Sequence, residues 1–423
     1  MADLSDRPAA GPLGGIAAAP PRARFAAFEV PTFRWYWGTS AISITGDGME
    51  NILRNWLVWE LTGSPLWLGM MVFAHWIPFT IFSLYGGILA DRYDNRKVQI
   101  VAQCLLLVAA LAVAVATIAG FVTEWWIFGF LLLHGFAGAI GGPAQQTLVH
   151  DMVGPGRLLS AVSLQSSTRQ VSQVVGPVVG GAILVTFGPG LGFLVNALTF
   201  LPLLAVLSVI RIHREIKLPD PGSTREAFAE GLRFIRSRPT ATSLIAVEMA
   251  PAIFLGHTFT SLLPIFVTEV LHTNEIGYAL LLAASGAGAF AAAVALAYVS
   301  EIRRKGLVIL AAAAVEVVAI LFFAVSETYA VSLALMLAIG AATVVTQALT
   351  NTTLQLSAPD RLRGRVMGAY SFGTQGMRVV NGPLLGGLAL AAGAPIAVAG
   401  SAGVVLVVLM AIALAAPQLR TVD

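Results

Sequence analysis

The sequence predicts an all-α integral membrane protein in which twelve transmembrane helices form two six-helix halves. Three observations lead to this fold class. The chain of 423 residues is 57% hydrophobic and only 11% charged, whereas a soluble domain carries about a quarter charged residues. Apolar stretches that reach the roughly 20 residues of a membrane-spanning helix recur along the chain. The second part of the chain also repeats motifs of the first.

Turn residues and charges divide the chain into spans and connections. The expected spans cover about 33–61, 65–90, 98–119, 125–149, 158–187, 190–211, 241–270, 276–300, 306–326, 330–356, 363–391 and 395–416. They define a disordered tail at 1–30, an N-terminal half at 31–211, a linker at 212–240, a C-terminal half at 241–416 and a short tail at 417–423. Within the linker, Thr224 to Arg236 is expected to form an amphipathic helix at the membrane surface.

Basic residues indicate how the chain is oriented. Of the 25 Lys and Arg residues, only Arg54, Arg169 and Arg378 lie well inside expected spans. The others lie in the tails, at helix ends or in every second loop, so the positive-inside rule places both termini in the cytoplasm. An even number of spans is then required. The formal net charge of +3 is explained by this orientation, and no nucleic-acid partner is expected.

Two glycine–proline motifs mark the internal repeat. The fifth span contains GPVVGG and the eleventh contains GPLLGG, and related segments at 154–162 and 358–366 precede them. A duplicated six-helix half is typical of transporters that rock about a site at the membrane midplane. The small residues predict either a hinge or a seam of close helix packing. The motif residues are Gly176, Pro177, Gly180, Gly181, Gly382, Pro383, Gly386 and Gly387.

The segment GGILADRYDNRKV, residues 86–98, resembles the loop signature of the major facilitator superfamily. The segments LTGSPLWLG (61–69), PAQQTLVHDMV (143–153) and LRGRVMGAY (362–370) are similar to bacterial drug and siderophore exporters, the branch of the enterobactin exporter and the macrolide efflux pumps. The resemblance implies the major facilitator fold in a bacterial cytoplasmic (inner) membrane. It also implies that GPVVGG is an antiporter motif. The fourth-span arginine of proton-linked exporters is absent, with Leu131 in its place and His134 nearby.

The resemblance further implies that the 86–98 loop is a gating latch in which Asp91 approaches the eleventh span. Alternatively, the loop only sets topology. The chain departs from the signature at Asp94 and Asn95, which stand where the family has a glycine and a base. The latch residues are Gly87, Asp91, Arg92, Arg96 and Lys97.

The first span contains a polar stripe in the stretch ITGDGMENILRNW. At 100° per residue, its four polar side chains fall within a sector of about 100°. They are Asp47, Glu50, Asn51 and Arg54. Glu50 and Arg54 have the i,i+4 spacing of an ion pair. An unpaired charge at the membrane centre costs at least about 2.5–3.5 kcal/mol, so we expect the stripe to line a central cavity.

With one base for two acids, either one carboxyl group is protonated at rest or both acids share Arg54. We interpret Asp47 as the proton carrier, Glu50 as its competitor and Arg54 as the charge that couples them. The alternative is a static ion pair that only holds the first span in place.

Further intramembrane groups have open roles. Glu248 is a candidate for binding a proton or a cationic substrate, and Glu316 is expected to act in helix packing or as a protonated acid. Arg169 and Arg378 would neutralise an anionic substrate, pair with acids across the halves, or bind loop acids such as Asp91 or Asp151. The scattered histidines are expected to pack, as is the single cysteine. They are His75, His134, His257 and Cys104.

The function that these residues favour is proton-driven export of a small amphiphilic molecule of drug or siderophore type. An uptake symporter and a membrane receptor without transport are the alternatives. No P-loop, nucleophile–base pair or metal constellation is present, so neither an enzyme nor a cofactor nor a metal is expected. The expected partners are the substrate, protons and the lipid bilayer, and the protein is expected to act as a monomer.

Overall fold

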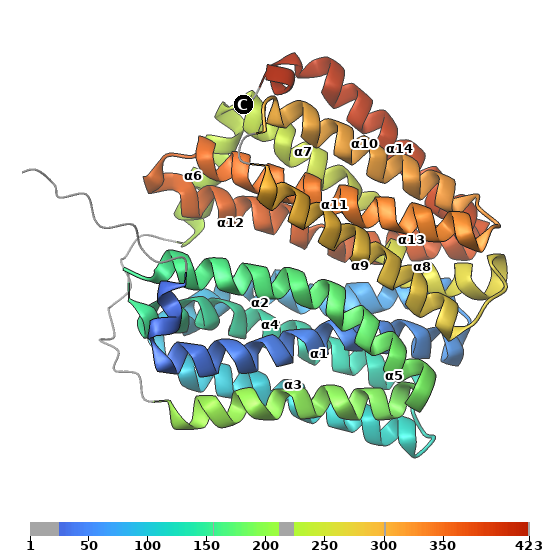
Figure 1. The fold of residues 1–423 in the computed structure, drawn as a ribbon, viewed down its shortest axis with the longest axis horizontal. Coiled ribbons are helices and arrows are strands. Elements are labelled where there is room, and N and C mark those ends of the chain that lie inside the picture. Colours follow the sequence, from blue (N-terminus) through green and yellow to red (C-terminus); the bar gives the residue numbers. More distant parts are fainter. Residues whose placement is uncertain (1–24, 155, 211–223, 300–301, 422–423) are drawn as a thin grey trace, which may run out of the picture.

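The computed structural model describes residues 25–154, 156–210, 224–299 and 302–421 and shows a bundle of helices (Figure 1). One layer of the bundle is built from five long helices. These are α1 (Pro31–Thr62), α2 (Pro65–Arg92), α3 (Asn95–Ile118), α4 (Glu124–Val153) and α5 (Leu158–Val209). Within this layer α1 packs on α5, α2 on α4, and α3 on both α4 and α5.

A second layer lies above the first in Figure 1. Its helices are α6 (Thr224–Ser237), α7 (Pro239–Phe254), α8 (Gly256–Ile265), η2 (Phe266–Val270), α9 (Glu275–Tyr298), α10 (Lys305–Ala324), α11 (Tyr329–Ser357), α12 (Asp360–Gly376), α13 (Arg378–Ala392) and α14 (Ala394–Ala415). Two short 3-10 helices, η1 (Ala26–Glu29) and η3 (Pro417–Thr421), lie at the same end of the bundle. We call the end that holds η1 and η3 the η end. The opposite end, where η2 lies, is called the far end.

Local signals in the sequence start and stop these helices. Proline occupies the first turn of α1, α2 and α7, where its missing N–H costs no hydrogen bond. Gly63 ends α1 in the left-handed conformation, which glycine adopts without strain. Asp94 caps α3 by accepting a hydrogen bond from the Arg96 N–H over 3.0 Å. The departure from the loop signature at Asp94 therefore has a structural role.

Within the described residues, nine helical segments are long and apolar enough to cross a membrane. One of these runs from Ser160 to Val209, and the backbone of Gly188 inside it is non-helical, with φ of 75°. Figure 1 shows α5 crossing the bundle, reversing at the far end and returning. The total of twelve spans remains a prediction, because α1, α12 and α13 do not meet the same criterion.

Several expected boundaries need correction. The seventh span is broken at Leu255 between α7 and α8, and the eleventh at Met377 between α12 and α13. Residues 1–24 and 211–223 of the expected tail and linker lie outside the described residues. The rest of the tail is ordered, because Ala27 is fully buried and Glu29 pairs with Arg157 at 3.0 Å. The expected amphipathic helix of the linker is confirmed as α6.

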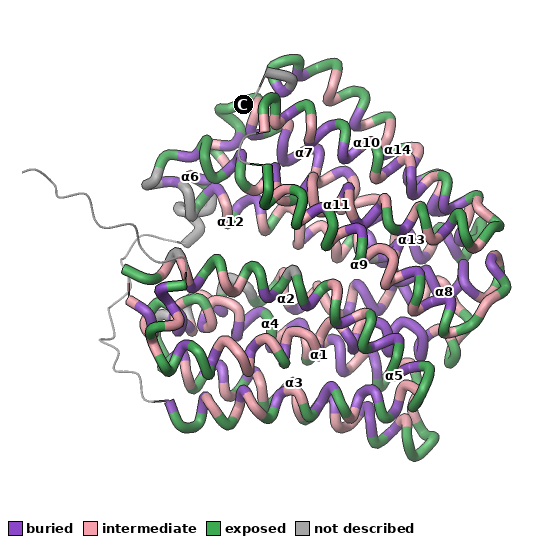
Figure 2. The backbone as a smooth tube through the Cα atoms, viewed as in Figure 1, coloured by how far each residue is buried: buried purple, intermediate pink, exposed green. Residues whose placement is uncertain are grey.

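Burial follows the membrane setting. Figure 2 shows exposed residues along much of the outer surface of the bundle. Many of these are large apolar side chains, such as Val108, Phe322 and Leu414, as expected for helices that face lipid. Cys104 also lies on this surface, so the expectation of a buried cysteine is wrong. An apolar sequence does not distinguish lipid-facing positions from core positions.

The two layers join closely toward the far end. Trp56 of α1 stacks on Tyr278 of α9 with ring centroids 5.6 Å apart, and Trp59 Nε1 donates to Thr268 Oγ1 over 3.1 Å. Glycines of α2 and α13 also meet there, since an added Cβ at Gly382 would overlap the carbonyl group of Gly69. Toward the η end, the ribbons of the two layers diverge (Figure 1).

Candidate functional site

A buried ion pair lies in α1, the helix that the sequence predicts to be the first span. Arg54 Nη1 donates a hydrogen bond over 2.9 Å to Glu50 Oε1, one turn earlier in α1. The two side chains are 8% and 2% exposed. The i,i+4 pair expected from the sequence therefore forms, and it lies entirely within one helix.

Asp47 has a different environment from Glu50. Its side chain is 37% exposed, and it lies one turn closer to the η end. His134 of α4 faces both acids, with Nε2 located 3.7 Å from Asp47 Oδ1 and 3.9 Å from Glu50 Oε2. An imidazole can take up or release a proton near neutral pH. His134 thus lies near both an accessible carboxyl group and a buried one, and it forms no hydrogen bond to either among the described residues.

His134 is the residue that reasoning from sequence missed, because it was expected only to pack. The signal was its neighbour Gly135, which lets α4 approach α2 so closely that an added Cβ would overlap the carbonyl group of His75. The rings of His75 and His134 lie 4.8 Å apart as a result. Two histidines from different helices therefore meet beside the acids of α1.

The polar stripe does not line a cavity along its whole length in this conformation. Glu50 and Arg54 are enclosed, and Asn51 accepts a hydrogen bond from Asn55 Nδ2 over 3.0 Å. The enclosure arises because α5 packs tightly on α1, with Gly176 against Gly48. Of the expected four, only Asp47 and Asn51 keep partial exposure.

Glu248 and Arg378 form a second charged region, in the other layer. Glu248 of α7 lies within electrostatic range of Arg378, the first residue of α13. Glu248 Oε1 is buried without a hydrogen-bond donor among the described residues. The guanidinium carbon of Arg378 lies 4.7 Å from the centre of the Trp76 ring of α2, a cation–π contact. Arg378 therefore contacts the opposite half through an aromatic face.

The other expected charges are more peripheral. Arg169 is exposed on α5 and forms no ion pair with a described acid. Glu316 of α10 accepts a hydrogen bond from Thr343 Oγ1 of α11 over 2.9 Å. This interhelical bond agrees with the packing role expected for Glu316. The side chain of His257 lies outside the described part of the structure.

The 86–98 loop contains an arginine that caps a helix. Arg96 donates from Nε and Nη2 to the carbonyl groups of Leu207 and Ser208, over 2.6 and 2.7 Å, at the end of α5. A cation at a helix C-terminus is favourable for the helix dipole. Arg92 and Lys97 are exposed, and Gly87 has open space around its Cα. The side chain of Asp91 lies outside the described part, so the latch remains a prediction.

The two glycine–proline motifs pack differently. In α5, Gly176 and Gly180 contact α1 of the same half, while Gly181 contacts Ala279 of α9. In α13, Gly382 and Gly386 contact α2 of the opposite half. Gly387 is the exception, since a Cβ there would meet nothing within 4 Å. Pro177 and Pro383 lie inside their helices, and whether either motif bends remains a prediction.

Asn381 stabilises the break in the seventh span. Its Nδ2 donates to the carbonyl group of Ile253 over 3.0 Å, and its Oδ1 accepts hydrogen bonds from the N–H and the hydroxyl group of Thr258. These groups flank the break at Leu255, where the regular helix hydrogen bonds are interrupted. The fully buried Asn381 therefore holds α13 to the broken segment.

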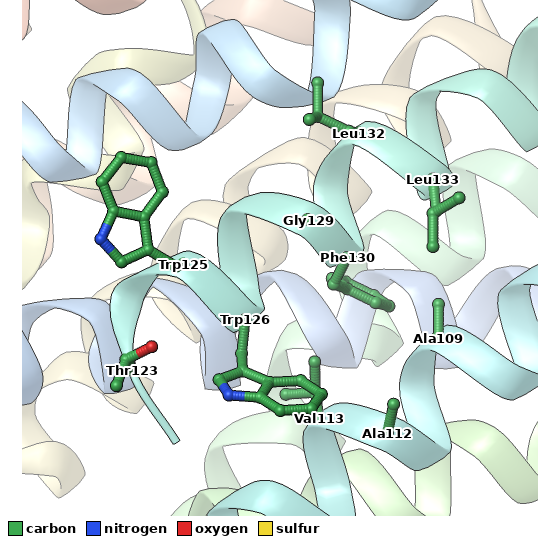
Figure 3. A pocket seen from close by; sticks show the side chains of 10 residues that line it. All are labelled: Ala109, Ala112, Val113, Thr123, Trp125, Trp126, Gly129, Phe130, Leu132 and Leu133. Carbon is green, nitrogen blue, oxygen red and sulfur yellow. The ribbon is translucent and has the colours of Figure 1, made fainter. Parts of the chain in front are cut away.

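A pocket of about 590 Å³ lies away from these charges, between α3 and α4. Figure 3 shows Trp125 and Trp126 at its edge and small residues such as Ala109 and Gly129 within it. The lining is apolar and faces the membrane side of the bundle. The Phe130 ring in its lining also lies 5.8 Å from the His134 ring. Phe130 thus lines this groove one helical turn from His134.

Comparison with known proteins relates the whole chain to transporters. Over 353 residues it is 26% identical to the multidrug efflux pump Tap of Mycolicibacterium fortuitum, covering 80% of this chain and 85% of that protein. It is also 26% identical to the enterobactin exporter EntS of Salmonella typhimurium, covering 90% of each. The staphyloferrin A transporter of Staphylococcus aureus is 22% identical over 56% of this chain and 59% of its own.

Solved structures support the fold. A bacterial homologue of the human lysosomal transporter Spinster, inward-facing and unoccupied, matches with a TM-score of 0.69 at 15% identity, over 95% of this chain and 98% of that one. The nucleoside transporter NupG also matches at 0.69, with 13% identity over 90% and 98%. The family model for transmembrane secretion effectors matches residues 22–423. The chain is therefore a multi-pass membrane transporter, not an enzyme, and it belongs to the transmembrane secretion effector family of the major facilitator superfamily.

Proposed function

We propose that this protein exports a small amphiphilic organic molecule, of drug or siderophore type, in exchange for protons. The relatives named as an efflux pump and as a siderophore exporter support the class of cargo. The observation that carries proton exchange is Asp47, a partly exposed carboxyl group in the middle of a spanning helix, beside His134. Acids at such positions cost free energy and commonly serve transport.

The geometry supports a division of labour between the two acids. Arg54 neutralises the charge of the Glu50 carboxylate within α1. Glu50 is therefore not expected to exchange protons while that ion pair persists. Asp47 forms no ion pair with an arginine or lysine among the described residues, and its side chain is partly exposed. A proton that binds Asp47 neutralises its carboxylate, and a proton that binds His134 makes its ring positive, so either step changes the charge of the site. Alternating access to the two membrane faces would convert this change into exchange.

The orientation of the chain is part of the proposal. With both termini in the cytoplasm, the η end is the inner end, and the structure is closed on the outside. The joined far end and the diverging η end then describe the state that accepts cargo from the cell. The protein acts as a monomer, because each of the two charged regions is completed by residues of a single chain.

The test is efflux of a panel of fluorescent amphiphiles from energised cells, with and without a protonophore. The protonophore is expected to abolish efflux by the wild-type protein. Asp47→Asn is expected to abolish efflux without the protonophore. Glu327→Gln, an acid-to-amide change at an exposed loop position, is the matched control and should leave efflux unchanged. Membrane levels of both variants are measured by immunoblot.

The other outcomes are equally informative. Unchanged efflux in Asp47→Asn would overturn the role of Asp47 and leave export intact. Efflux that resists the protonophore in the wild-type protein would overturn proton coupling. Accumulation of a panel compound in cells would instead reverse the direction and favour the uptake symporter. His134→Gln is expected to shift the pH dependence of efflux, a change that a packing role alone would not produce.

A further inference from the structure

A second pocket lies at the η end of the C-terminal half. It measures about 350 Å³ and is formed by α6, α7, α14 and η3. Its lining residues are Arg236, Pro239, Thr242, Ser243, Ala246, Ile412, Ala415, Ala416 and Gln418. None of these residues belongs to the charged regions described above.

The lining changes character along the α7 axis. The side nearest the helix start contains the guanidinium group of Arg236 and the hydroxyl groups of Thr242 and Ser243. Further along α7 the lining becomes apolar, with Ala246 facing Ile412 and Ala415 of α14. The Thr242 and Ser243 hydroxyl groups already donate to the backbone carbonyl groups of Ile235 and Pro239, so Arg236 defines the polar end. A binding site with a cationic end and an apolar end matches an anionic amphiphile.

The pocket opens on the outside of the bundle. At 100° per residue, Pro239 and Ala246 lie about 160–180° around α7 from Glu248, so they occupy opposite faces. On α14, the lining residue Ala415 is itself exposed, and Leu414, which is 77% exposed, lies about 100° further around the helix. This exposed face is lipid-facing in a membrane protein. The apolar end of the pocket therefore continues onto the surface that contacts acyl chains.

Positive charge gathers at the polar end. Arg233, Arg236 and Arg238 are all exposed, and no acid with a described side chain pairs with them. The guanidinium carbon of Arg238 lies 5.6 Å from the Phe234 ring centre, which holds it close to the start of α7. The amphipathic helix α6 carries Arg233 and Arg236, and such helices lie at membrane surfaces rich in anionic lipid.

We propose that this pocket binds an anionic phospholipid of the inner leaflet. The phosphate lies against Arg236, with Arg238 beside it. One acyl chain follows Ala246, Ile412 and Ala415. Basic pockets between helices near a membrane surface bind anionic headgroups in this way. The site lies outside the proposed transport path, and it does not depend on proton exchange.

The experiment is native mass spectrometry of the full-length protein with phosphatidylglycerol, compared with phosphatidylcholine of the same chain length. Phosphatidylglycerol is expected to form the tighter single adduct. Each surface arginine is expected to contribute about equally to binding of the anionic lipid. Arg236→Gln should therefore weaken this binding about fivefold, and the double variant Arg236→Gln with Arg238→Gln about thirtyfold. Ala415→Trp, which fills the apolar end, should weaken binding of both lipids.

Arg233→Gln is the matched control, since Arg233 lies on the same helix and does not line the pocket. If Arg233→Gln weakens binding as much as Arg236→Gln, attraction by general charge explains the adduct and the proposal is overturned. Equal binding of the two lipids would also overturn it. If inorganic phosphate displaced the adduct as effectively as phosphatidylglycerol does, the pocket would be an anion site without lipid specificity. That result would refute the proposal that it binds a phospholipid. Unchanged unfolding temperatures exclude loss of fold in each variant.

Discussion

The two charged regions of the transporter are built on opposite principles. In the N-terminal half, Glu50 and Arg54 pair within α1, and His134 approaches from α4 of the same half. In the C-terminal half, Arg378 of α13 neighbours Glu248 of α7, but its guanidinium face rests on Trp76 of the opposite half. One region is closed within its own half, and the other crosses between halves.

This difference indicates how each region behaves when the transporter changes state. Alternating access in this fold is largely a rigid-body rocking of one half against the other. Contacts within a half persist during such a motion, whereas contacts between halves at one end break. The Glu50–Arg54 pair is therefore expected in both states. The Arg378–Trp76 contact belongs to the state described here.

The glycine motifs follow the same division. Gly176 of α5 packs on Gly48 inside its half, while its counterpart Gly382 of α13 packs on Gly69 across the halves. A duplicated motif thus serves two different seams. In the α5 copy, Gly176 and Gly180 hold a half together and Gly181 packs across the halves on Ala279, whereas Gly382 and Gly386 of the α13 copy both pack across the halves at the far end.

The largest expected effect comes from breaking the pair within the half. Arg54→Leu leaves the buried Glu50 carboxylate without its base, and we expect a loss of about 3–5 kcal/mol in stability. The measurement is thermal unfolding of the purified protein. The double variant Glu50→Gln with Arg54→Leu is the control and should recover most of the loss. Equal stability of the wild type and Arg54→Leu would contradict a persistent ion pair.

A smaller effect is expected at the seam between halves. Gly382→Val would overlap Gly69 in the closed state, an overpacking cost of about 1–3 kcal/mol, and should favour opening of the far end. We would measure the distance between spin labels at Leu61→Cys and Ile276→Cys in a Cys104→Ser background. Gly387→Val is the matched control, because open space surrounds Gly387. The same distance distribution in both valine variants would refute the seam.

The smallest effect concerns the cation–π contact. Trp76→Leu removes the aromatic face under Arg378, which should shift the equilibrium away from the closed far end by about 1 kcal/mol, or about fivefold. The same spin-label pair reports the shift. Trp76→Phe keeps an aromatic face and should restore most of the closed population. A leucine variant that matches the phenylalanine variant would show that the ring face contributes nothing.

The sequence determined the features that depend on neighbours along the chain. Apolar length predicted spanning helices, and most observed ends lie within a few residues of those expected. The i,i+4 spacing predicted the Glu50–Arg54 pair, because residues one helical turn apart must be neighbours. The loop signature and the repeat likewise predicted the family, which the match over residues 22–423 confirms.

Only the tertiary structure decided which polar groups meet between helices and which are enclosed. Asp47 and Glu50 share one face of α1, yet one is 37% and the other 2% exposed. Their difference arises from helices that are distant in sequence: α5 packs on α1 where Gly176 meets Gly48, and α4 packs on α2 at Gly135 and carries His134 toward both acids. The same is true of His134, of Trp76 beneath Arg378, and of Asn381 at the helix break. Spacing along one helix fixes a direction, but the depth of burial depends on which helix packs there and how closely.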